Sequence, residues 1–476
     1  MTVLVVGGGI TGLTAAYALG HAGVPTTLVE ATDRLGGKLQ TEHVDGFLVE
    51  SGPDSFIAYR PAALELCREL GLGDAIIRPT DPRVVNVRTG GRFVRLPDGI
   101  GLVLPTKMRP LVTTRMFSPL EKVRMGLDLI LPRAGDEGDV AVGPFLRRRL
   151  GDALVKRLAG PLIGGVYGTS IDELSVDAVV PQLREAERDH RSLLLASLAQ
   201  GRARKRSGVT PGSPFVALAG GLGQMTDGLV SALEGSPSVT VRMGTALASL
   251  ERQGPGFVAR LAGDERLQVD AVVLTSPAPI AAGLLHDLAP AAAGHLRTIP
   301  YGSTAVVSLG YRADQFPAPL VGHGFLVADS EPLTISACTW SSLKWVERAP
   351  AGMVLLRAFI GANREPLLAG PDAEIATAAQ RDIALTMGVR GEPALTRVAR
   401  WQGAMPHYTV GHLDRVDAIF ESLAGMPNLV LAGGAYRGVG LPDCITQGRA
   451  AATQVQSVLG GSASLHTPSP EGEHPK

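Results

Sequence analysis

The sequence predicts a mixed α/β (α+β) fold, with a parallel-sheet domain, a mixed-sheet domain and a helical domain. Residues 3–6 form a short apolar run bounded by glycine, residues 14–19 read as helix, and residues 24–30 form a second, β-branched run. A strand, a turn, a helix and a strand in this order form the unit from which parallel sheets are built. Further apolar runs of strand length return at 239–241, 271–274 and 429–431. The parallel sheet is therefore expected to be assembled from discontinuous pieces.

The segments between these runs predict the other two domains. Residues 61–70 have the pattern of an amphipathic helix. Residues 93–198 alternate Gly-Pro-rich loops with charged helical stretches, at 121–131 and 144–158, which indicates a mainly helical insertion. A short β-rich region is expected at 304–360.

Composition limits the classes of function. A chain of 476 residues with 45% hydrophobic residues can bury a large core and should divide into more than one domain. The 45 Lys and Arg balance the 45 Asp and Glu, which excludes the overall positive field of a protein that coats nucleic acid or anionic membranes. Cys67, Cys338 and Cys444 lie too far apart in the chain to indicate a zinc site or a disulfide framework. With no membrane-length apolar run and no leader, we expect a soluble cytoplasmic protein without nucleic-acid partners.

A glycine motif follows the first predicted strand. In Gly7-x-Gly9-x-x-Gly12 the glycines let backbone N–H groups approach a pyrophosphate at a helix N-terminus. Glu30 ends the next strand about twenty residues later, where a carboxylate can accept the ribose hydroxyls of an adenosine. The motif predicts nucleotide binding, with the cofactor-binding residues Gly7, Gly8, Gly9, Ile10, Thr11, Gly12, Glu30 and Ala31.

The string from Asp33 to Lys38 distinguishes FAD from NAD. It resembles the R-x-G-G-[RK] element of the amine-oxidase-like flavoproteins, in which the glycines pack against the pyrophosphate and a basic residue offsets its charge. The alternative is an ordinary Gly-Gly turn. The resemblance implies an FAD/NAD(P)-binding domain of Rossmann type that binds FAD, and adds Arg34, Gly36, Gly37 and Lys38 as cofactor-binding residues.

Two small-residue turns supply the remaining cofactor candidates. Residues 50–55 can bring backbone amides to an isoalloxazine edge, and residues 433–445 run from a strand into a helix whose positive end can face the flavin pyrimidine. The alternative for the first turn is a capped turn before Pro61. These turns add Gly52, Pro53, Asp54, Ser55, Gly434, Val439, Gly440 and Leu441 to the cofactor-binding residues.

Several strings together resemble the protoporphyrinogen and coproporphyrinogen oxidases over almost the whole chain. They are residues 50–56, 164–168 with 172–175, 220–223 and 438–445. Residues 337–345 and 400–412 look specifically like the soluble bacterial coproporphyrinogen-oxidising members. The resemblance implies FAD-domain pieces at 1–75, 206–285 and 401–459, a substrate domain at 76–92 and 286–400, a helical domain at 93–205 and a disordered tail at 460–476.

The resemblance also implies the chemistry. A porphyrinogen of haem biosynthesis would lose hydride to flavin N5, and dioxygen would reoxidise the flavin to give hydrogen peroxide. No catalytic side chain and no metal ligand is predicted, and FAD is expected to be bound non-covalently, since no flavinylation motif is present. The helical domain of membrane-bound relatives docks on lipid, but the many charges of residues 93–198 predict a solvated helical domain here. Transient contact with neighbouring pathway enzymes is a further expectation.

Substrate carboxylates need cations, and Arg60 and Arg88 are the candidates, with an ordinary surface charge as the alternative for each. Gly165 is expected to face the macrocycle, and Phe359 stands where a relative can carry Tyr. Leu247 and Trp401 are carried over as further cofactor-binding residues, and the alternative for Trp401 is a packed core aromatic. His407 and His412 flank Tyr408, and we interpret both as structural.

Three other functions stay open. Protoporphyrinogen IX is the alternative substrate within the family. A flavin amine oxidase or desaturase would act on another substrate, and a flavin-binding carrier protein would have no activity. Only porphyrinogen oxidation would produce a fluorescent porphyrin with consumption of oxygen.

Overall fold

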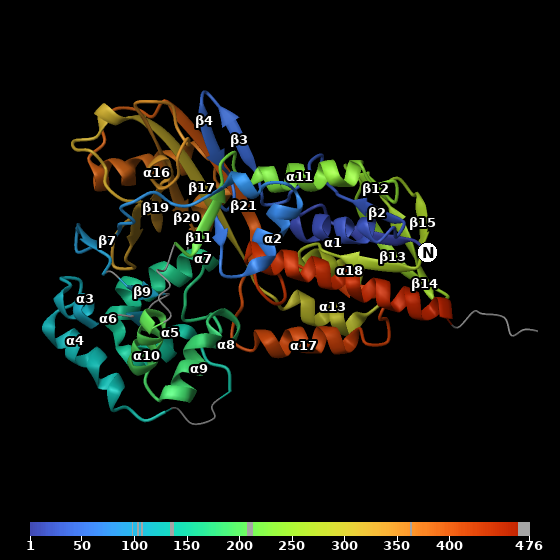
Figure 1. The fold of residues 1–476 in the computed structure, drawn as a ribbon, viewed down its shortest axis with the longest axis horizontal. Helices are drawn as coiled ribbons and strands as arrows, with labels where there is room; N and C mark the ends of the chain where they lie inside the picture. The colour runs from blue at the N-terminus through green and yellow to red at the C-terminus, as the bar shows by residue number, and fades with distance from the viewer. Residues whose placement is uncertain are drawn as a thin grey trace, which may run out of the picture.

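The computed structural model describes residues 1–97, 99–101, 104–105, 108–133, 138–206, 213–361 and 364–464 (Figure 1). At its centre lies a five-stranded sheet of order β12-β2-β1-β16-β22. Every pairing in it is parallel. The strands are β1 (Val3–Val6), β2 (Thr26–Val29), β12 (Val239–Arg242), β16 (Ala271–Leu274) and β22 (Leu429–Leu431). The predicted strands and their assembly from discontinuous pieces are confirmed.

Both faces of this sheet are covered, which explains why its strands read as continuous apolar runs. Val3 and Val5 share one core cluster with helices on the first face, while Leu4 and Val6 belong to a second cluster on the opposite face. The first face carries α1 (Ile10–His21), α2 (Pro61–Glu69), α11 (Gly223–Glu234) and α18 (Leu441–Ser464). The second carries strands β13 (Leu247–Gln253), β14 (Gly256–Leu261) and β15 (Arg266–Val269) with helices α12 (Ala278–Leu284), α13 (Pro290–Arg297) and α17 (His412–Ser422).

A seven-stranded mixed sheet of order β21-β17-β20-β19-β18-β7-β8 forms the second part of the molecule. Only the β18–β7 pairing is parallel. Its strands are β7 (Val85–Thr89), β8 (Arg92–Arg95), β17 (Tyr301–Arg312), β18 (Gly324–Val327), β19 (Ala337–Trp340), β20 (Met353–Ile360) and β21 (Leu395–Pro406). Short helix α14 (Ser341–Lys344) follows β19, α15 (Glu365–Ala369) follows β20, and α16 (Asp372–Met387) packs on the sheet. The β-rich region expected at 304–360 is confirmed.

The helical part lies below this sheet in Figure 1. Its helices are α3 (Met108–Thr113), α4 (Pro119–Gly126), α5 (Val142–Leu150), α6 (Asp152–Leu154), α7 (Gly165–Tyr167), α8 (Val176–Val179), α9 (Pro181–His190) and α10 (Leu193–Arg206). The helical stretch expected at 144–158 is divided at Gly151, whose φ is +87°. A π-helical segment, Val155–Gly164, follows α6.

Smaller elements connect these parts. The hairpin β3 (Thr41–Val44) and β4 (Phe47–Glu50) precedes a three-stranded sheet of β5 (Phe56–Ile57), β11 (Phe215–Leu218) and β6 (Ile76–Ile77). Strands β9 (Ile100–Gly101) and β10 (Leu104–Pro105) pair with each other. Short 3₁₀ turns occupy Gly73–Ala75, Leu127–Leu129 and Ala313–Gln315.

The packing moves some of the expected boundaries. Strand β8 pairs with β7 and β21 runs to Pro406, so the mixed sheet extends past residues 92 and 400. Helix α13 packs in the core of the parallel sheet, which favours a substrate domain that begins near residue 300. Of the tail expected to be disordered, residues 460–464 continue α18, and residues 465–476 lie outside the described part. With these shifts we propose the same division into three domains.

The helical domain, which is expected to be solvated, exposes several apolar side chains at and near α4. Leu120, Val123 and Ile130, on α4 and the turn after it, are 80%, 63% and 71% exposed, and Val112 and Leu127 are exposed beside them in sequence. In the part of the chain that the structure describes, no helix is both long and apolar enough to cross a bilayer.

Candidate active site

A cavity of about 1570 Å³ lies where the parallel sheet, the mixed sheet and the helical part meet. Its wall contains the turns after β1, β2 and β16, parts of β18 to β20, and residues of the π-helical segment. Ligand pockets of drug size usually occupy roughly 300 to 1000 Å³. The cavity is therefore large enough for two sizeable molecules side by side.

The first glycine turn forms one end of the cavity. A Cβ on Gly12 would lie 1.9 Å from the Gly7 carbonyl oxygen, so this glycine is required for α1 to pack closely on β1. A Cβ on Gly9 would meet no atom within 4 Å, because it would point into the cavity. Among the described residues, no side chain caps α1 and none in its first turn is acidic. The turn is a cradle that a side chain would fill, at a helix end that attracts anions.

Glu30 stands at the end of β2 and lines the cavity with Ala31. Its Oε2 accepts a hydrogen bond of 2.7 Å from the Gly8 amide, and its Oε1 accepts from the amide and hydroxyl of Thr32, at 2.9 and 2.8 Å. These bonds fix a carboxylate beside the glycine cradle. Such a carboxylate can accept hydrogen bonds from ribose hydroxyls.

The Gly36-Gly37 loop packs directly on the cradle. The Gly36 amide donates to the Gly8 carbonyl at 2.8 Å, and a Cβ on Gly37 would lie 3.1 Å from the Cα of Gly9. The Arg34 guanidinium holds the loop by donating to the Gly37 carbonyl at 2.6 Å. Lys38 lines the cavity and donates to the Ala404 carbonyl, and burial lowers the pKa of its ammonium group. The loop's glycines allow a backbone approach that any larger residue would block.

The turn at residues 51–55 is held from behind by the mixed sheet. Gly52, Pro53 and Ser55 line the cavity, but the Asp54 carboxylate is directed away from it. That carboxylate accepts hydrogen bonds from Lys344 Nζ and Trp345 Nε1, each at 3.0 Å. Burial alone would raise the pKa of Asp54, but the neighbouring cations Lys344 and Arg357 hold it well below its ordinary value.

The second glycine loop, residues 433–441, connects β22 to α18 and also lines the cavity. Tyr408 holds this loop, because its hydroxyl donates to the Gly434 carbonyl at 2.8 Å and accepts from the Gly438 amide at 2.9 Å. The ring of His412 stacks on Tyr408 at a centroid distance of 3.9 Å, and its Nε2 lies 2.8 Å from the Tyr436 carbonyl oxygen. His412 is fully buried, and burial lowers its pKa to about 4. These contacts agree with the interpretation of His412 as structural.

The buried His412 leads to a pH-dependent stability. The unfolded chain binds a proton on this ring below about pH 6.5, whereas the folded chain binds it only below about pH 4. The free energy of unfolding should therefore fall as the pH drops from 6.5 to 4, by up to about 1.4 kcal/mol per pH unit from this residue. Chemical denaturation at several pH values should show that the free energy of unfolding changes less with pH, that is, with a smaller slope, in His412→Gln than in the wild type.

The control for this measurement is His295→Gln, at an exposed histidine of α13. An unchanged slope in His412→Gln, or an equal loss of slope in His295→Gln, would contradict the assignment.

The cavity collects most of the predicted residues. Of the cofactor candidates it is lined by Gly7, Gly9, Ile10, Thr11, Glu30, Ala31, Gly36, Gly37, Lys38, Gly52, Pro53, Ser55, Leu247, Trp401, Gly434, Val439, Gly440 and Leu441, and of the substrate candidates by Arg60, Gly165 and Phe359. The predicted site residues that do not line the cavity are Gly8, Gly12, Arg34, Asp54 and Arg88. Gly8, Gly12 and Arg34 support the cradle and its loop instead.

The two arginines proposed for the substrate differ in position. Arg60 lies in the cavity wall and forms an ion pair with Asp443 of α18. Arg88 lies behind the wall, with its Nε 3.6 Å from the carboxylate of Glu331 and its guanidinium over the Phe93 ring. Arg88 therefore does not line the cavity, although its partner Glu331 does.

Sequence reasoning missed several wall residues. Thr275 and Ser276 follow β16, and since ligands bind at the carboxyl ends of parallel strands, the expected strand at 271–274 could have indicated them. Arg147 lines the cavity and pairs with Asp172, with Arg147 Nη2 2.9 Å from the Asp172 carboxylate. Arg364 also lines it and donates to the Leu333 carbonyl at 3.0 Å. No motif in the sequence indicated either arginine.

A parallel sheet whose first strand ends in a glycine cradle, followed by an acidic residue at the next strand, defines a protein that binds a dinucleotide cofactor. The family model described as flavin containing amine oxidoreductase matches residues 10–456. The chain is 45% identical to a coproporphyrinogen III oxidase of Propionibacterium freudenreichii subsp. freudenreichii, over 95% of this chain and 90% of the relative. It is 36% identical to a coproporphyrinogen III oxidase of Bacillus subtilis, over 96% and 98% of the two chains.

A solved structure from Exiguobacterium, provisionally named a protoporphyrinogen oxidase, has a TM-score of 0.83 and 32% identity, over 96% of this chain and 98% of the other. The chain therefore belongs to the flavin-containing amine oxidoreductases, in the porphyrinogen oxidase family that its motifs resemble. It is an oxidoreductase with FAD as its cofactor.

Proposed function

We propose that the protein oxidises coproporphyrinogen III to coproporphyrin III in haem biosynthesis. The observation that carries the proposal is the continuous cavity, which joins the glycine cradle to a second region between the mixed sheet and the helical part. FAD, when bound, would supply hydride acceptance at N5 and the reduction of dioxygen to hydrogen peroxide. The names of the relatives support the choice of substrate.

The chain's own residues would bind and orient the two molecules. The cradle and Glu30 would hold the adenosine diphosphate half of FAD, and the turn at 51–55 with Trp401 would border its ring system. Trp401 is fixed for this task because its Nε1 donates to the Ser51 carbonyl at 2.9 Å. Gly165 and Phe359 would border the macrocycle from the helical part and from β20.

We propose that FAD is held without a covalent bond. Cys444 lines the cavity in the first turn of α18, and it is the thiol to consider. Burial raises the pKa of this thiol, which disfavours the thiolate that a covalent attachment requires. We further propose a cytoplasmic location, in agreement with a balanced charge and with free thiols at all three cysteines.

The charges of the wall restrict where the carboxylates of a substrate could be bound. Arg60, Arg147 and Arg364 are its cations outside the cofactor end, while Asp172, Asp329, Glu331 and Asp443 would repel carboxylates. Propionates should therefore be bound near the arginines. A propionate that approaches Arg60 would share or replace its ion pair with Asp443.

Protoporphyrinogen IX stays the alternative substrate. The exposed apolar side chains on α4 favour it, because they remove the argument that the helical part presents only a polar surface. The two porphyrinogens differ in that two propionates of coproporphyrinogen are vinyl groups in protoporphyrinogen. A direct comparison of kcat/KM for both substrates, by porphyrin fluorescence and oxygen consumption, decides between them. Higher kcat/KM for protoporphyrinogen IX would reject coproporphyrinogen as the preferred substrate.

Substitution of Arg60 tests how the carboxylates are bound. Arg60→Ala should lower kcat/KM for coproporphyrinogen about tenfold, since a partly exposed charge-assisted contact contributes roughly 1 kcal/mol or somewhat more. The loss should be smaller for protoporphyrinogen and smaller at high ionic strength, because exposed ion pairs are screened.

The matched control is Arg88→Ala, which removes an arginine that lies behind the wall. Equal losses for the two substrates, or an Arg88→Ala variant that loses more selectivity than Arg60→Ala, would contradict the role of Arg60.

A further inference from the structure

A cluster of buried charges lies behind the turn at residues 51–55, on the side away from the cavity. This turn is called the flavin-side turn below. Arg357 of β20 is 2% exposed, donates through Nη2 to the Gly52 carbonyl and has its Nη1 3.5 Å from the Asp54 carboxylate. Lys344 Nζ lies 3.0 and 3.2 Å from the two Asp54 carboxylate oxygens. The fully buried Trp345 donates its Nε1 to the same carboxylate. One aspartate and one carbonyl of the turn are thus anchored by Arg357 of β20 and by Lys344 and Trp345 at the end of α14.

Among the buried and half-buried groups of this cluster, cations outnumber carboxylates. Glu50, on the strand before the turn, accepts hydrogen bonds from the Leu222 amide at 2.7 Å and from the Thr41 hydroxyl at 2.8 Å. Arg348 completes the cluster, with its guanidinium bonded to the carbonyls of Leu218 and Ala219. Three cations (Lys344, Arg348 and Arg357) therefore face two carboxylates (Glu50 and Asp54), and burial raises the pKa of Glu50. A third carboxylate, Glu347, interacts with Arg348 but is exposed. A charge excess of this kind is weakly screened because the groups are buried.

The stability of the core does not by itself require a buried cation at position 357. An apolar residue of similar volume often stabilises a core as well as a buried ion pair does. The position of Arg357 points to another purpose, since it is bonded to both ends of the segment Gly52–Asp54, and Gly52, Pro53 and Ser55 line the cavity. Its guanidinium fixes where that backbone stands and places a positive charge directly behind it.

We propose that Arg357 is a positioning residue for the flavin-side turn and that Arg357 and Lys344 together raise the reduction potential of the bound flavin. A positive charge near the ring system stabilises the negative charge that the flavin gains on reduction. The inference rests on the proposed placement of the flavin ring against the turn at 51–55. It does not depend on which substrate the protein oxidises.

The test uses the flavin affinity of the apoprotein and the reduction potential of the reconstituted holoprotein, both without substrate. Arg357→Met should raise the Kd for FAD at least tenfold and lower the two-electron equilibrium constant for flavin reduction about tenfold, which corresponds to about 30 mV. Asp54→Asn should also weaken FAD binding, because the turn loses its anchor, but it should raise the potential, because it removes a negative charge. Both variants should therefore raise the Kd, while the potential falls in Arg357→Met and rises in Asp54→Asn. A loosened structure alone would not shift the potential in opposite directions.

Three further variants separate charge from position. Lys344→Met should lower the potential and change the Kd less than threefold, since Lys344 contacts the Asp54 side chain but not the Gly52 carbonyl. Arg357→Lys should restore most of the potential but not the full affinity. Arg348→Met is the matched control, because it removes a buried cation of the same cluster that bonds to Leu218 and Ala219 and not to the turn.

The proposal is overturned if Arg357→Met retains the wild-type Kd and potential, or if Arg348→Met changes the Kd as much as Arg357→Met. It is also overturned if Asp54→Asn lowers the potential. Should Arg357→Met not fold, Lys344→Met and Asp54→Asn still give the two opposite signs. A wild-type protein that binds FAD but oxidises no porphyrinogen would reject the proposed function and leave this inference standing.

Discussion

Gly9→Val is expected to give a folded protein that no longer binds FAD. The added side chain meets no protein atom within 4 Å at its Cβ, so the fold should tolerate it. It would instead occupy the space into which the first turn of α1 opens, where the pyrophosphate is expected. The Kd for FAD should rise at least about a hundredfold, a loss of about 3 kcal/mol of binding free energy. FAD titration of the purified apoprotein, with far-UV circular dichroism for the fold, measures both parts.

Two other glycines serve as controls. Gly294→Val, in α13, also adds a side chain to an open space, but outside the cavity, and should retain FAD. Gly12→Val should fail to fold, because its Cβ would overlap the Gly7 carbonyl oxygen. A Gly9→Val protein with wild-type affinity for FAD would show that the cradle does not hold the pyrophosphate.

The cofactor end of the cavity could be predicted because its determinants are local in the sequence. The apolar run of β1, the glycines after it and the acidic residue after β2 lie within the first thirty residues, and each has a fixed place in a strand-turn-helix-strand unit. The remote strands of the sheet could be predicted because strands buried on both faces are short continuous apolar runs.

Asp54 and Arg88 do not line the cavity, and for both the difference lies in the side of the backbone on which the charge stands. Asp54 belongs to the predicted turn, but the sequence does not show that Lys344 and Arg357 lie behind it, some 290 residues later in the chain. Arg88 alternates with the buried Val87 on β7, and only the pairing of β7 with β18 brings it to Glu331 rather than to the cavity. Such contacts between distant segments leave no periodic pattern.

The run Arg147-Arg148-Arg149 shows the same limit. Three adjacent arginines on α5 point to three different surroundings: Arg147 lines the cavity, Arg148 pairs with Glu187 at 3.0 Å, and Arg149 is 1% exposed. In the sequence these three residues are identical, and nothing in the run itself distinguishes them. Successive positions of a helix differ by about 100° around its axis, so their roles depend on what packs on each side.

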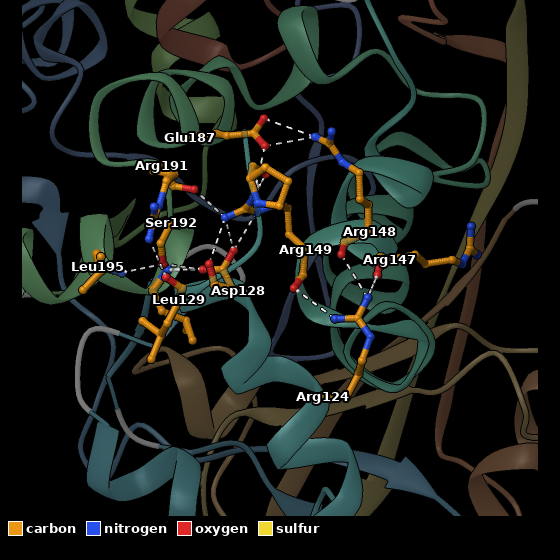
Figure 2. Close-up of polar contacts among 12 residues, drawn as sticks. Arg124, Asp128, Leu129, Arg147, Arg148, Arg149, Glu187, Arg191, Ser192 and Leu195 are labelled. Carbon is orange, nitrogen blue, oxygen red and sulfur yellow. Dashed lines mark hydrogen bonds and ion pairs between the residues drawn. The ribbon is translucent and has the colours of Figure 1, made fainter. Parts of the chain in front are cut away.

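Asp128→Ala should cause the largest loss of stability among the substitutions considered for the helical part. Figure 2 shows the fully buried Asp128 carboxylate at the centre of a polar network. Its Oδ1 accepts from Arg149 Nε at 2.6 Å, and its Oδ2 accepts from the Ser192 hydroxyl at 2.6 Å and from the Leu194 amide at 2.9 Å. The carboxylate therefore joins the turn after α4 to α5 and to the start of α10.

Removal of this carboxylate leaves the buried Arg149 guanidinium with Glu187, 3.5 Å away, as its remaining carboxylate partner among the described residues. Loss of one member of a buried ion pair costs about 3 to 5 kcal/mol. In denaturant titrations the midpoint for unfolding of the helical part should move to a lower denaturant concentration. Hydrogen exchange should show that the amides of α5 and α10 open more often. The parallel sheet should keep its protection and its FAD.

The matched control is Asp189→Asn, at an exposed pair with Arg188 in which the side chains are 62% and 72% exposed. Such a pair contributes between 0 and about 1 kcal/mol, so the control should be nearly neutral. The double variant Asp128→Leu/Arg149→Met should be more stable than Asp128→Ala, because it removes the unpaired charge along with its partner. If Asp128→Ala cost no more than Asp189→Asn, the network would not stabilise the helical part. If the double variant were the less stable, Arg149 would contribute through its bonds to the Pro132 and Arg191 carbonyls rather than through its charge pair.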